Sequence, residues 1–231
     1  MIEAEKKAAK LFREIERRNL MIPGKSENQI NTEIFDLAYE MYGIRKYWHK
    51  RIVRCGQNTL EPYNENPKNL ILKQDDILFI DFGPIFEEWE ADFGRTYVLG
   101  NDPYKLKLKK DIESAWHDCK RHFETKKEIT GAELYNYAFN LAFEYNWEFG
   151  GEIAGHIIGH YPHEKLEKED KTNYIHPENH QNMFENDKEN KVRNWILEIH
   201  FVDKEKKIGG FFEQILAKIG LLLLLLVINN K

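Results

Sequence analysis

The sequence has few of the features that indicate a disulfide-stabilised, nucleic-acid-binding or secreted protein. Its only cysteines, Cys55 and Cys119, are far apart and form no CxxC pair, so we predict reduced thiols in an intracellular protein. The 34 basic residues are outnumbered by 39 acidic ones, and no basic block stands alone, which argues against a nucleic-acid partner. The charged start, MIEAEKKAAK, lacks the apolar core of a signal peptide.

Long apolar runs are also scarce. The only one covers residues 219–228, where Leu221 to Leu226 are consecutive. Ten residues are too few to cross a bilayer, which needs about 20. We therefore expect a buried terminal strand or helix turn here, no membrane partner and a cytoplasmic protein. The oligomeric state stays open, with a homodimer that buries this tail as one alternative.

The composition indicates one packed globular domain. Of the 231 residues, 42% are hydrophobic and 13% aromatic, which is typical of a folded protein with a sizeable core. No linker suggests a second domain, so we predict a single catalytic domain over residues 1–231.

Helical and strand-like patterns alternate along the chain. Residues 3–20 have apolar side chains at helical spacing, and Ser26 with Gln29 resembles a capping box that opens a second helix. Strand candidates follow at 77–83 and 93–100. Two further helices are expected at about 105–126 and 131–147, and two further strands at 195–202 and 209–216. The order helix, helix, strands thus occurs twice, which predicts a duplicated α+β unit, and the polar segment 164–194 is expected to be a surface excursion.

Four acidic residues interrupt otherwise apolar strand patterns. Asp81 ends the run ILFID, Asp92 follows eleven residues later, Glu198 lies in WILEIHFV, and Glu213 lies in GGFFEQIL. Any one of them could be an edge-strand carboxylate that faces water. Four such interruptions together weaken that interpretation, because a carboxylate is costly to bury without a partner.

Carboxylates gathered in this way need a cation between them. Four carboxylates and one neutral imidazole suit a pair of divalent metal ions. Such a pair produces a nucleophile from water at neutral pH and polarises a carbonyl oxygen. The residues therefore indicate metal-assisted hydrolysis.

The imidazole could come from GHIIGHYPHE, residues 155–164. On a helix His156, His160 and His163 would share one face, but Gly155, Gly159 and Pro162 oppose a helix there. A glycine-bearing strand or turn is predicted instead. This removes the scaffold for a three-histidine zinc site without choosing between the histidines.

These residues resemble the pita-bread metallopeptidase family, which includes methionine aminopeptidases, aminopeptidase P, prolidase and creatinase. The family has the ligand order Asp, Asp, His, Glu, Glu, with eleven residues from the first Asp to the second and the histidine in a GHGIG…HE motif. Here the motif is Gly155-His156-Ile157-Ile158-Gly159 followed by His163-Glu164. The resemblance implies pseudo-duplicated helix-helix-strand units around a curved antiparallel sheet.

The resemblance also implies a dinuclear metal site and residue roles. The implied metal ligands are Asp81, Asp92, His163, Glu198 and Glu213. His156 would lie near the substrate carbonyl or the bridging water, and Glu198 would also act as general base. His160 would be a bystander, with contact to substrate as the lesser alternative. Two divalent ions are implied, with manganese favoured and cobalt, zinc or iron as alternatives.

Within the family, DFGRTYVLG is closer to the Asp-x-x-Arg-Thr pattern of aminopeptidase P and prolidase. This implies an aminopeptidase with a peptide substrate, of the Xaa-Pro type. Arg95 is similar to the arginine of that branch, and a structural ion pair is expected for it because arginine suits buried pairing. The sequence departs from the pattern where Ile199 replaces a usual proline and where the prolidase-type histidine is missing. Tyr63 or His49 could replace that histidine in contacting substrate, although a structural role is the simpler expectation for each.

Two alternatives remain open at this point. The large N-terminal domain of prolidases is not recognisable, and the missing histidine leaves room for a catalytically inactive peptide- or protein-binding module. The other alternative is hydrolysis of a different C–N bond, as in creatinase-like members, which work without the metal pair.

Overall fold

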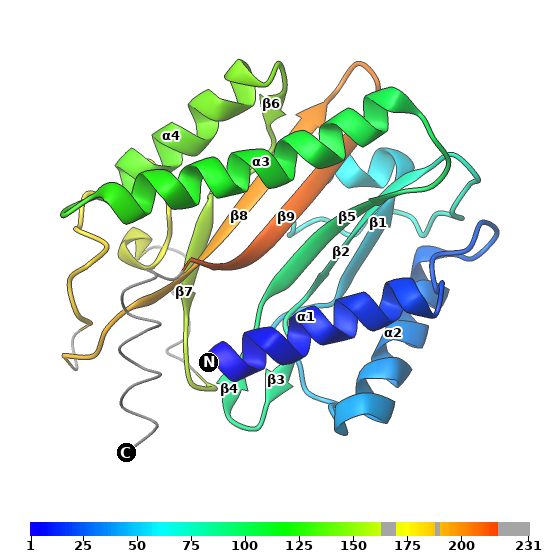
Figure 1. Cartoon of the computed structure of the whole chain (residues 1–231), viewed down its shortest axis with the longest axis horizontal. Helices are drawn as coiled ribbons and strands as arrows, with labels where there is room; N and C mark the ends of the chain where they lie inside the picture. Colours follow the sequence, from blue (N-terminus) through cyan, green and yellow to red (C-terminus); the bar gives the residue numbers. More distant parts are fainter. Residues whose placement is uncertain (163–169, 188–189, 217–231) are drawn as a thin grey trace.

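The computed structural model describes residues 1–162, 170–187 and 190–216 and contains two pairs of helices around one main sheet (Figure 1). The helices are α1 (Ile2–Arg17), α2 (Glu27–Tyr42), α3 (Pro103–Thr125) and α4 (Gly131–Glu144). The strands are β1 (Ile52–Cys55), β2 (Ile77–Phe82), β3 (Ile85–Phe86), β4 (Trp89–Glu90), β5 (Phe93–Val98), β6 (Glu148–Phe149), β7 (Gly155–Ile158), β8 (Asn194–Asp203) and β9 (Ile208–Leu216). Short 3₁₀ helices occupy Gly56–Leu60 and Lys171–Asn173.

Side-chain caps set the starts of α2 and α4. The Ser26 hydroxyl accepts a hydrogen bond from the Gln29 N–H, and the Gln29 side chain accepts one from the Ser26 N–H. Thr130 and Glu133 form the same reciprocal arrangement before α4. Each cap satisfies N–H groups that the first helical turn leaves without a partner. The predicted helices and the predicted cap of α2 are therefore confirmed.

The main sheet is antiparallel throughout its described pairs. Its strand order is β1-β2-β5-β9-β8-β6, with β7 also pairing with β8. In Figure 1, α3 and α4 lie over β8 and β9, whereas α1 and α2 lie beside the part of the sheet formed by β1, β2 and β5. The repeated order of two helices followed by strands confirms the predicted duplicated α+β unit.

Each half has its own apolar core. One core gathers side chains of α1, α2, β1 and β2, with Phe12, Ile34 and Phe82 fully or almost fully buried. The other gathers α3, α4, β8 and β9 around Trp116 and Trp195. The two cores lie on neighbouring parts of one sheet. The pairing of β5 with β9 therefore connects the two halves.

The segment predicted as a surface excursion is partly buried. Ile175 and Met183 lie in the second core, and the Asn179 carbonyl accepts a hydrogen bond from the Ala132 N–H at 2.7 Å. The prediction failed because a few apolar side chains anchor this mostly polar stretch. The apolar run 219–228 lies outside the described residues, and within the described ranges no helix is long and apolar enough to cross a membrane.

Candidate metal centre

Three of the four predicted carboxylates lie in one row across the sheet. Asp81 on β2 is paired with Gly94 on β5, Gly94 with Glu213 on β9, and Glu213 with Glu198 on β8. Gly94 leaves room for this row, because a Cβ atom at its position would lie 2.6 Å from the Phe211 ring and 3.0 Å from the Glu213 Cβ. The register of four strands therefore brings Asp81, Glu213 and Glu198 together.

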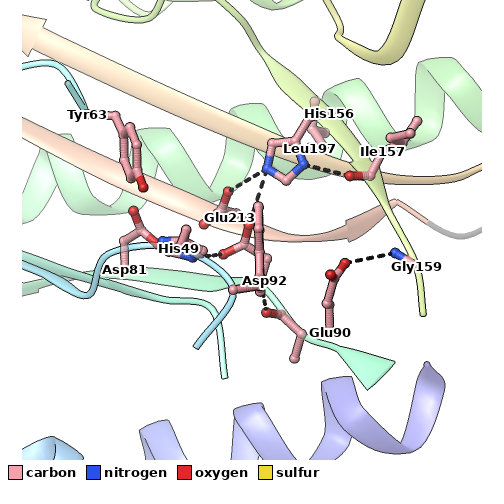
Figure 2. Close-up of polar contacts among 12 residues, drawn as sticks. His49, Tyr63, Asp81, Glu90, Asp92, His156, Ile157, Gly159, Leu197 and Glu213 are labelled. Carbon is pink, nitrogen blue, oxygen red and sulfur yellow. Dashed lines mark hydrogen bonds and ion pairs between the residues drawn. The ribbon is translucent and has the colours of Figure 1, made fainter. Parts of the chain in front are cut away.

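Asp92 lies just before β5, two residues from Gly94. Its side chain is only 2% exposed. Each of its two carboxylate oxygens faces a different imidazole, with His49 Nε2 3.0 Å from Oδ1 and His156 Nε2 3.2 Å from Oδ2. Figure 2 shows Asp92 between the two rings. Asp92 is thus the shared member of the cluster.

His156 projects from β7 toward the carboxylates. Strand β7 is held by pairing with β8 and by a hydrogen bond from the Ile175 N–H to the Gly155 carbonyl. The His156 Nδ1 atom lies 2.8 Å from the Ile157 carbonyl oxygen, and its Nε2 atom also lies 4.0 Å from Glu213 Oε1. With Nδ1 bonded to the backbone, Nε2 is the nitrogen available to the site.

His49 reaches the same cluster from the segment between α2 and β1. Its Nε2 atom lies 3.0 Å from Asp92 and 3.6 Å from Asp81 Oδ1. Its Nδ1 atom lies 2.8 Å from the Lys50 carbonyl oxygen. The two histidines therefore approach Asp92 in the same manner from two different directions (Figure 2).

Burial and mutual repulsion shape the charges of the cluster. Burial raises the pKa of Asp81 and of Glu198 above the ordinary carboxyl range, and for Glu213 burial and the nearby carboxylates do the same. For Asp92, burial is outweighed by His49 and His156, which hold its pKa below the ordinary value. Burial lowers the pKa of His49, but Asp92 and Asp81 raise it to about 9. Raised pKa values mean that these groups bind protons readily, and a site of this kind also favours binding of a cation.

The donor set fits divalent metal ions. Among the described residues, no hydrogen-bond partner contacts Asp81 Oδ1, Glu198 Oε1 or Glu213 Oε2, although all three atoms are buried. Buried carboxylate oxygens without partners are costly, and cations between them would remove that cost. Two groups have ligand atoms close enough to share an ion: His49, Asp81 and Asp92, and Asp92, His156 and Glu213. Carboxylate and imidazole ligands suit manganese, iron, cobalt and zinc.

The other predicted residues have different positions. His163, the expected histidine ligand, lies outside the described residues. His160 is half exposed and pairs with Glu88 at 3.0 Å, and its role as a bystander stays a prediction. The Tyr63 hydroxyl accepts a hydrogen bond from the Lys50 N–H at 3.2 Å, which supports the backbone next to His49.

Arg95 supports the strand that carries Glu213. Its guanidinium donates to the carbonyl oxygens of Gly94 and Glu213 at 2.7 and 2.8 Å and lies 3.7 Å from the ring centres of Phe93 and Phe212. These contacts are with carbonyl oxygens and aromatic faces, where a structural ion pair was predicted. Arginine suits such a site because its planar group can hydrogen-bond and stack together.

The sequence did not indicate that His49 lies beside Asp81 and Asp92. The pattern KYWHK contains no ligand spacing, and His49 and Asp92 are 43 residues apart. The only signal in the sequence is a histidine among aromatic residues shortly before a strand, which is a weak indication of any function.

Comparison with known proteins identifies the family. The model of metallopeptidase family M24 matches residues 1–195, so the chain belongs to this family. The fold is shared with an X-Pro aminopeptidase from Thermotoga maritima, at 19% identity and a TM-score of 0.73, over 94% of this chain and 59% of that one. It is shared with the prolidase from Pyrococcus horikoshii OT3, at 20% identity and a TM-score of 0.71, over 92% and 56% of the two chains. The predicted family and α+β fold are confirmed.

Two further similarities differ in how much of the relative they cover. A methionine aminopeptidase from Thermotoga maritima is 17% identical with a TM-score of 0.68, over 94% of this chain and 95% of that one. A curated Mycoplasma genitalium protein named "Putative Xaa-Pro aminopeptidase" is 28% identical over 109 residues, which are 46% of this chain and 30% of that protein. The chain thus spans less than two thirds of the prolidase and of this curated relative.

Proposed function

We propose that this chain is a dinuclear-metal-dependent aminopeptidase that hydrolyses the N-terminal peptide bond of peptides, with preference for an Xaa-Pro bond. The observation that carries the proposal is the row of Asp81, Glu213 and Glu198, with Asp92 beside it and three buried carboxylate oxygens that lack partners among the described residues. Membership of a metallopeptidase family supports the metal dependence. The Xaa-Pro preference is supported by the motif DFGRTYVLG and by the names of the relatives.

The four carboxylates would hold two divalent ions, and a histidine would complete the set. The family resemblance gives this role to His163 and a substrate-facing role to His156. The contacts of His156 with Asp92 at 3.2 Å and with Glu213 at 4.0 Å instead support His156 as the ligand. We therefore assign the ligand role to His156 and leave His163 as the candidate for the substrate-facing role.

The ions, when bound, would supply a water-derived nucleophile at neutral pH and polarise the scissile carbonyl. The chain's own residues would then position the substrate and move protons. Glu198 reaches the cluster from β8, and its buried Oε1 atom has no hydrogen-bond partner in the described part of the chain. This placement supports Glu198 as the general base that accepts a proton from the attacking water.

The proposal is tested by release of N-terminal residues from a small peptide panel. Xaa-Pro peptides and peptides that start with methionine are compared with manganese-reconstituted protein, with and without EDTA. We expect release of the residue before proline that EDTA abolishes and added manganese restores. Release from the methionine peptides alone would contradict the Xaa-Pro preference.

Two other outcomes would contradict more of the proposal. Hydrolysis that survives EDTA would contradict the metal dependence. Tight peptide binding by the metal-loaded protein without any cleavage would favour the binding module instead. The missing prolidase-type histidine is the feature of the chain that makes this last outcome worth measuring.

A further inference from the structure

His49 is the residue of the cluster that the five-ligand pattern leaves out. Its side chain is 8% exposed, and its Nε2 atom lies 3.0 Å from Asp92 Oδ1 and 3.6 Å from Asp81 Oδ1. In the described part of the chain, Asp81 Oδ1 has no hydrogen-bond partner. The imidazole nitrogen and the two carboxylates thus surround a position that a cation could occupy (Figure 2).

The surroundings of His49 fix its ring in this direction. The ring packs edge-on against Trp48, with ring centres 4.5 Å apart, and the Trp48 indole N–H donates to the Ala91 carbonyl at 3.0 Å. Gly83 provides the necessary space, because a Cβ atom at its position would lie 2.1 Å from His49 Cδ2. The position of His49 is therefore built by its neighbours and does not depend on the contact with Asp92 alone.

The hydrogen bond at the far side of the ring is the one that metal-binding histidines commonly make. His49 Nδ1 lies 2.8 Å from the Lys50 carbonyl, and His156 Nδ1 lies 2.8 Å from the Ile157 carbonyl. When Nδ1 carries the proton that this bond needs, Nε2 can present its lone pair to an ion. In both histidines the backbone carbonyl belongs to the next residue along the chain, so the two rings are oriented by the same local device.

We propose that His49 is an additional metal ligand. Its Nε2 atom would bind one ion together with Asp81 and Asp92, while His156 binds the second ion together with Asp92 and Glu213. This inference rests on the dinuclear site of the proposed function and adds to it an imidazole on the Asp81 side. The competing role is that of a permanently protonated ion-pair partner, which would orient Asp92 without touching a metal.

An imidazole on each ion has a consequence for metal preference. Oxygen ligands alone suit manganese, whereas nitrogen ligands favour zinc and cobalt. A site with His49 as ligand should bind zinc or cobalt more tightly, relative to manganese, than the same site without it. Replacement of His49 should therefore reduce zinc affinity more than manganese affinity.

The test is calorimetric titration of metal-stripped protein with zinc and, separately, with manganese. The variants are His49→Gln and His49→Ala, and the matched control is His160→Gln, which changes a half-exposed histidine paired with Glu88. We expect wild type and the control to bind two zinc ions. In the His49 variants one of the two sites should lose at least about tenfold in zinc affinity, with a smaller loss for manganese.

X-ray absorption of the zinc-loaded proteins gives a readout that a merely structural role would not move. The number of imidazole nitrogens per two zinc ions should be lower in His49→Gln by one and unchanged in His160→Gln. An unchanged imidazole count in His49→Gln would overturn the inference and leave the dinuclear site intact. Failure of wild-type protein to bind any metal would instead contradict the proposed function itself, so the two failures are distinguishable.

Discussion

At the scale of single residues, Asp92 is the centre of the site. Its two oxygens face two imidazoles, at 3.0 and 3.2 Å, and it is almost completely buried. Each oxygen could therefore contribute to a different ion of the proposed metal pair. Asp92 lies just before a strand, where the chain is still irregular. At that place it can contact His49 from one half of the fold and His156 from the other.

The assignment of His156 as the histidine ligand predicts how replacement of each histidine affects metal binding. Replacement of His156 by alanine should abolish tight binding of one ion and reduce peptide turnover by several orders of magnitude, because its Nε2 lies beside Asp92 and Glu213. Replacement of His163 by alanine should leave metal stoichiometry unchanged. Metal content after gel filtration and steady-state kinetics measure both effects. Loss of an ion in the His163 variant, with full content in the His156 variant, would reverse the assignment.

The clustering of the carboxylates could be predicted from the sequence, whereas the residues alone did not choose between the histidines. Asp81 and Glu213 each break an apolar strand pattern, and that cost is visible in a single segment of sequence. The position of His156 depends on how β7 pairs with β8, and the position of His49 depends on a turn that brings it to a residue 43 positions away. Contacts of this kind arise from tertiary packing, which no local pattern records.

At the scale of elements, most boundaries followed local rules. The caps of α2 and α4 use hydroxyl and carboxamide or carboxylate side chains at the expected spacing, and Gly43 ends α2 with a φ of 69°, which suits glycine. The segment 170–187 was mispredicted because two or three buried side chains decide its position. The composition of this segment is mostly polar, and composition alone does not show that a few of its apolar side chains are buried.

Glu27, at the start of α2, is expected to stabilise the fold through buried hydrogen bonds. Its buried carboxylate accepts hydrogen bonds from the Cys55 N–H at 2.7 Å, the Asn58 side chain at 2.9 Å and the Leu70 N–H at 3.0 Å. It therefore connects α2 to β1 and to the segment that precedes β2. Replacement of Glu27 by alanine leaves the two backbone N–H groups unpaired, whereas the Asn58 side chain keeps its hydrogen bond to the Lys68 carbonyl. The loss should lower the free energy of unfolding by about 3 kcal/mol. Urea denaturation measures this loss.

The matched control is Glu40→Ala on the same helix. Glu40 forms an exposed ion pair with Arg18 at 2.6 Å, and exposed pairs of this kind contribute at most about 1 kcal/mol. A similar loss in both variants would mean that removal of any acidic side chain from α2, and not the loss of the buried hydrogen bonds, sets the effect. A loss below about 1 kcal/mol for Glu27→Ala would contradict the connecting role.

At the scale of the whole molecule, the candidate site lies where the two halves meet. Between β5 and β9 the paired residues are Gly94 and Glu213. Side chains add to this connection, since the Thr96 hydroxyl donates to the Phe211 carbonyl at 2.8 Å and accepts from the Phe211 N–H at 2.6 Å. Asp81 and Asp92 belong to the first half, and His156, Glu198 and Glu213 to the second. Ions held by both sets would connect the halves.

This arrangement predicts that metal stabilises the fold. Without metal, the junction contains four carboxyl groups in a buried space, and burial raises the pKa of Asp81, Glu198 and Glu213, so that charge there is relieved only by protons and by the two histidines. Ions that bind the folded chain and not the unfolded one stabilise it by about 2.7 kcal/mol each when their concentration is about a hundred times the dissociation constant. For a chain of this size, about 1 kcal/mol raises the melting temperature by roughly 2–4 °C. Each ion should therefore raise the melting temperature of EDTA-treated protein by roughly 5–10 °C in differential scanning calorimetry.

The variant Asp92→Asn separates this effect from general ion binding at the surface. It keeps the shape of the side chain but removes the charge that both imidazoles face, so the melting temperature of the variant should no longer respond to zinc or manganese. Its metal-free form should remain folded, because the two apolar cores lie on either side of the junction and keep all their contacts. An equal rise in wild type and Asp92→Asn would mean that the stabilising ions bind elsewhere. A rise in melting temperature only in wild type would show that the Asp92 carboxylate is needed for metal to stabilise the junction between the two halves.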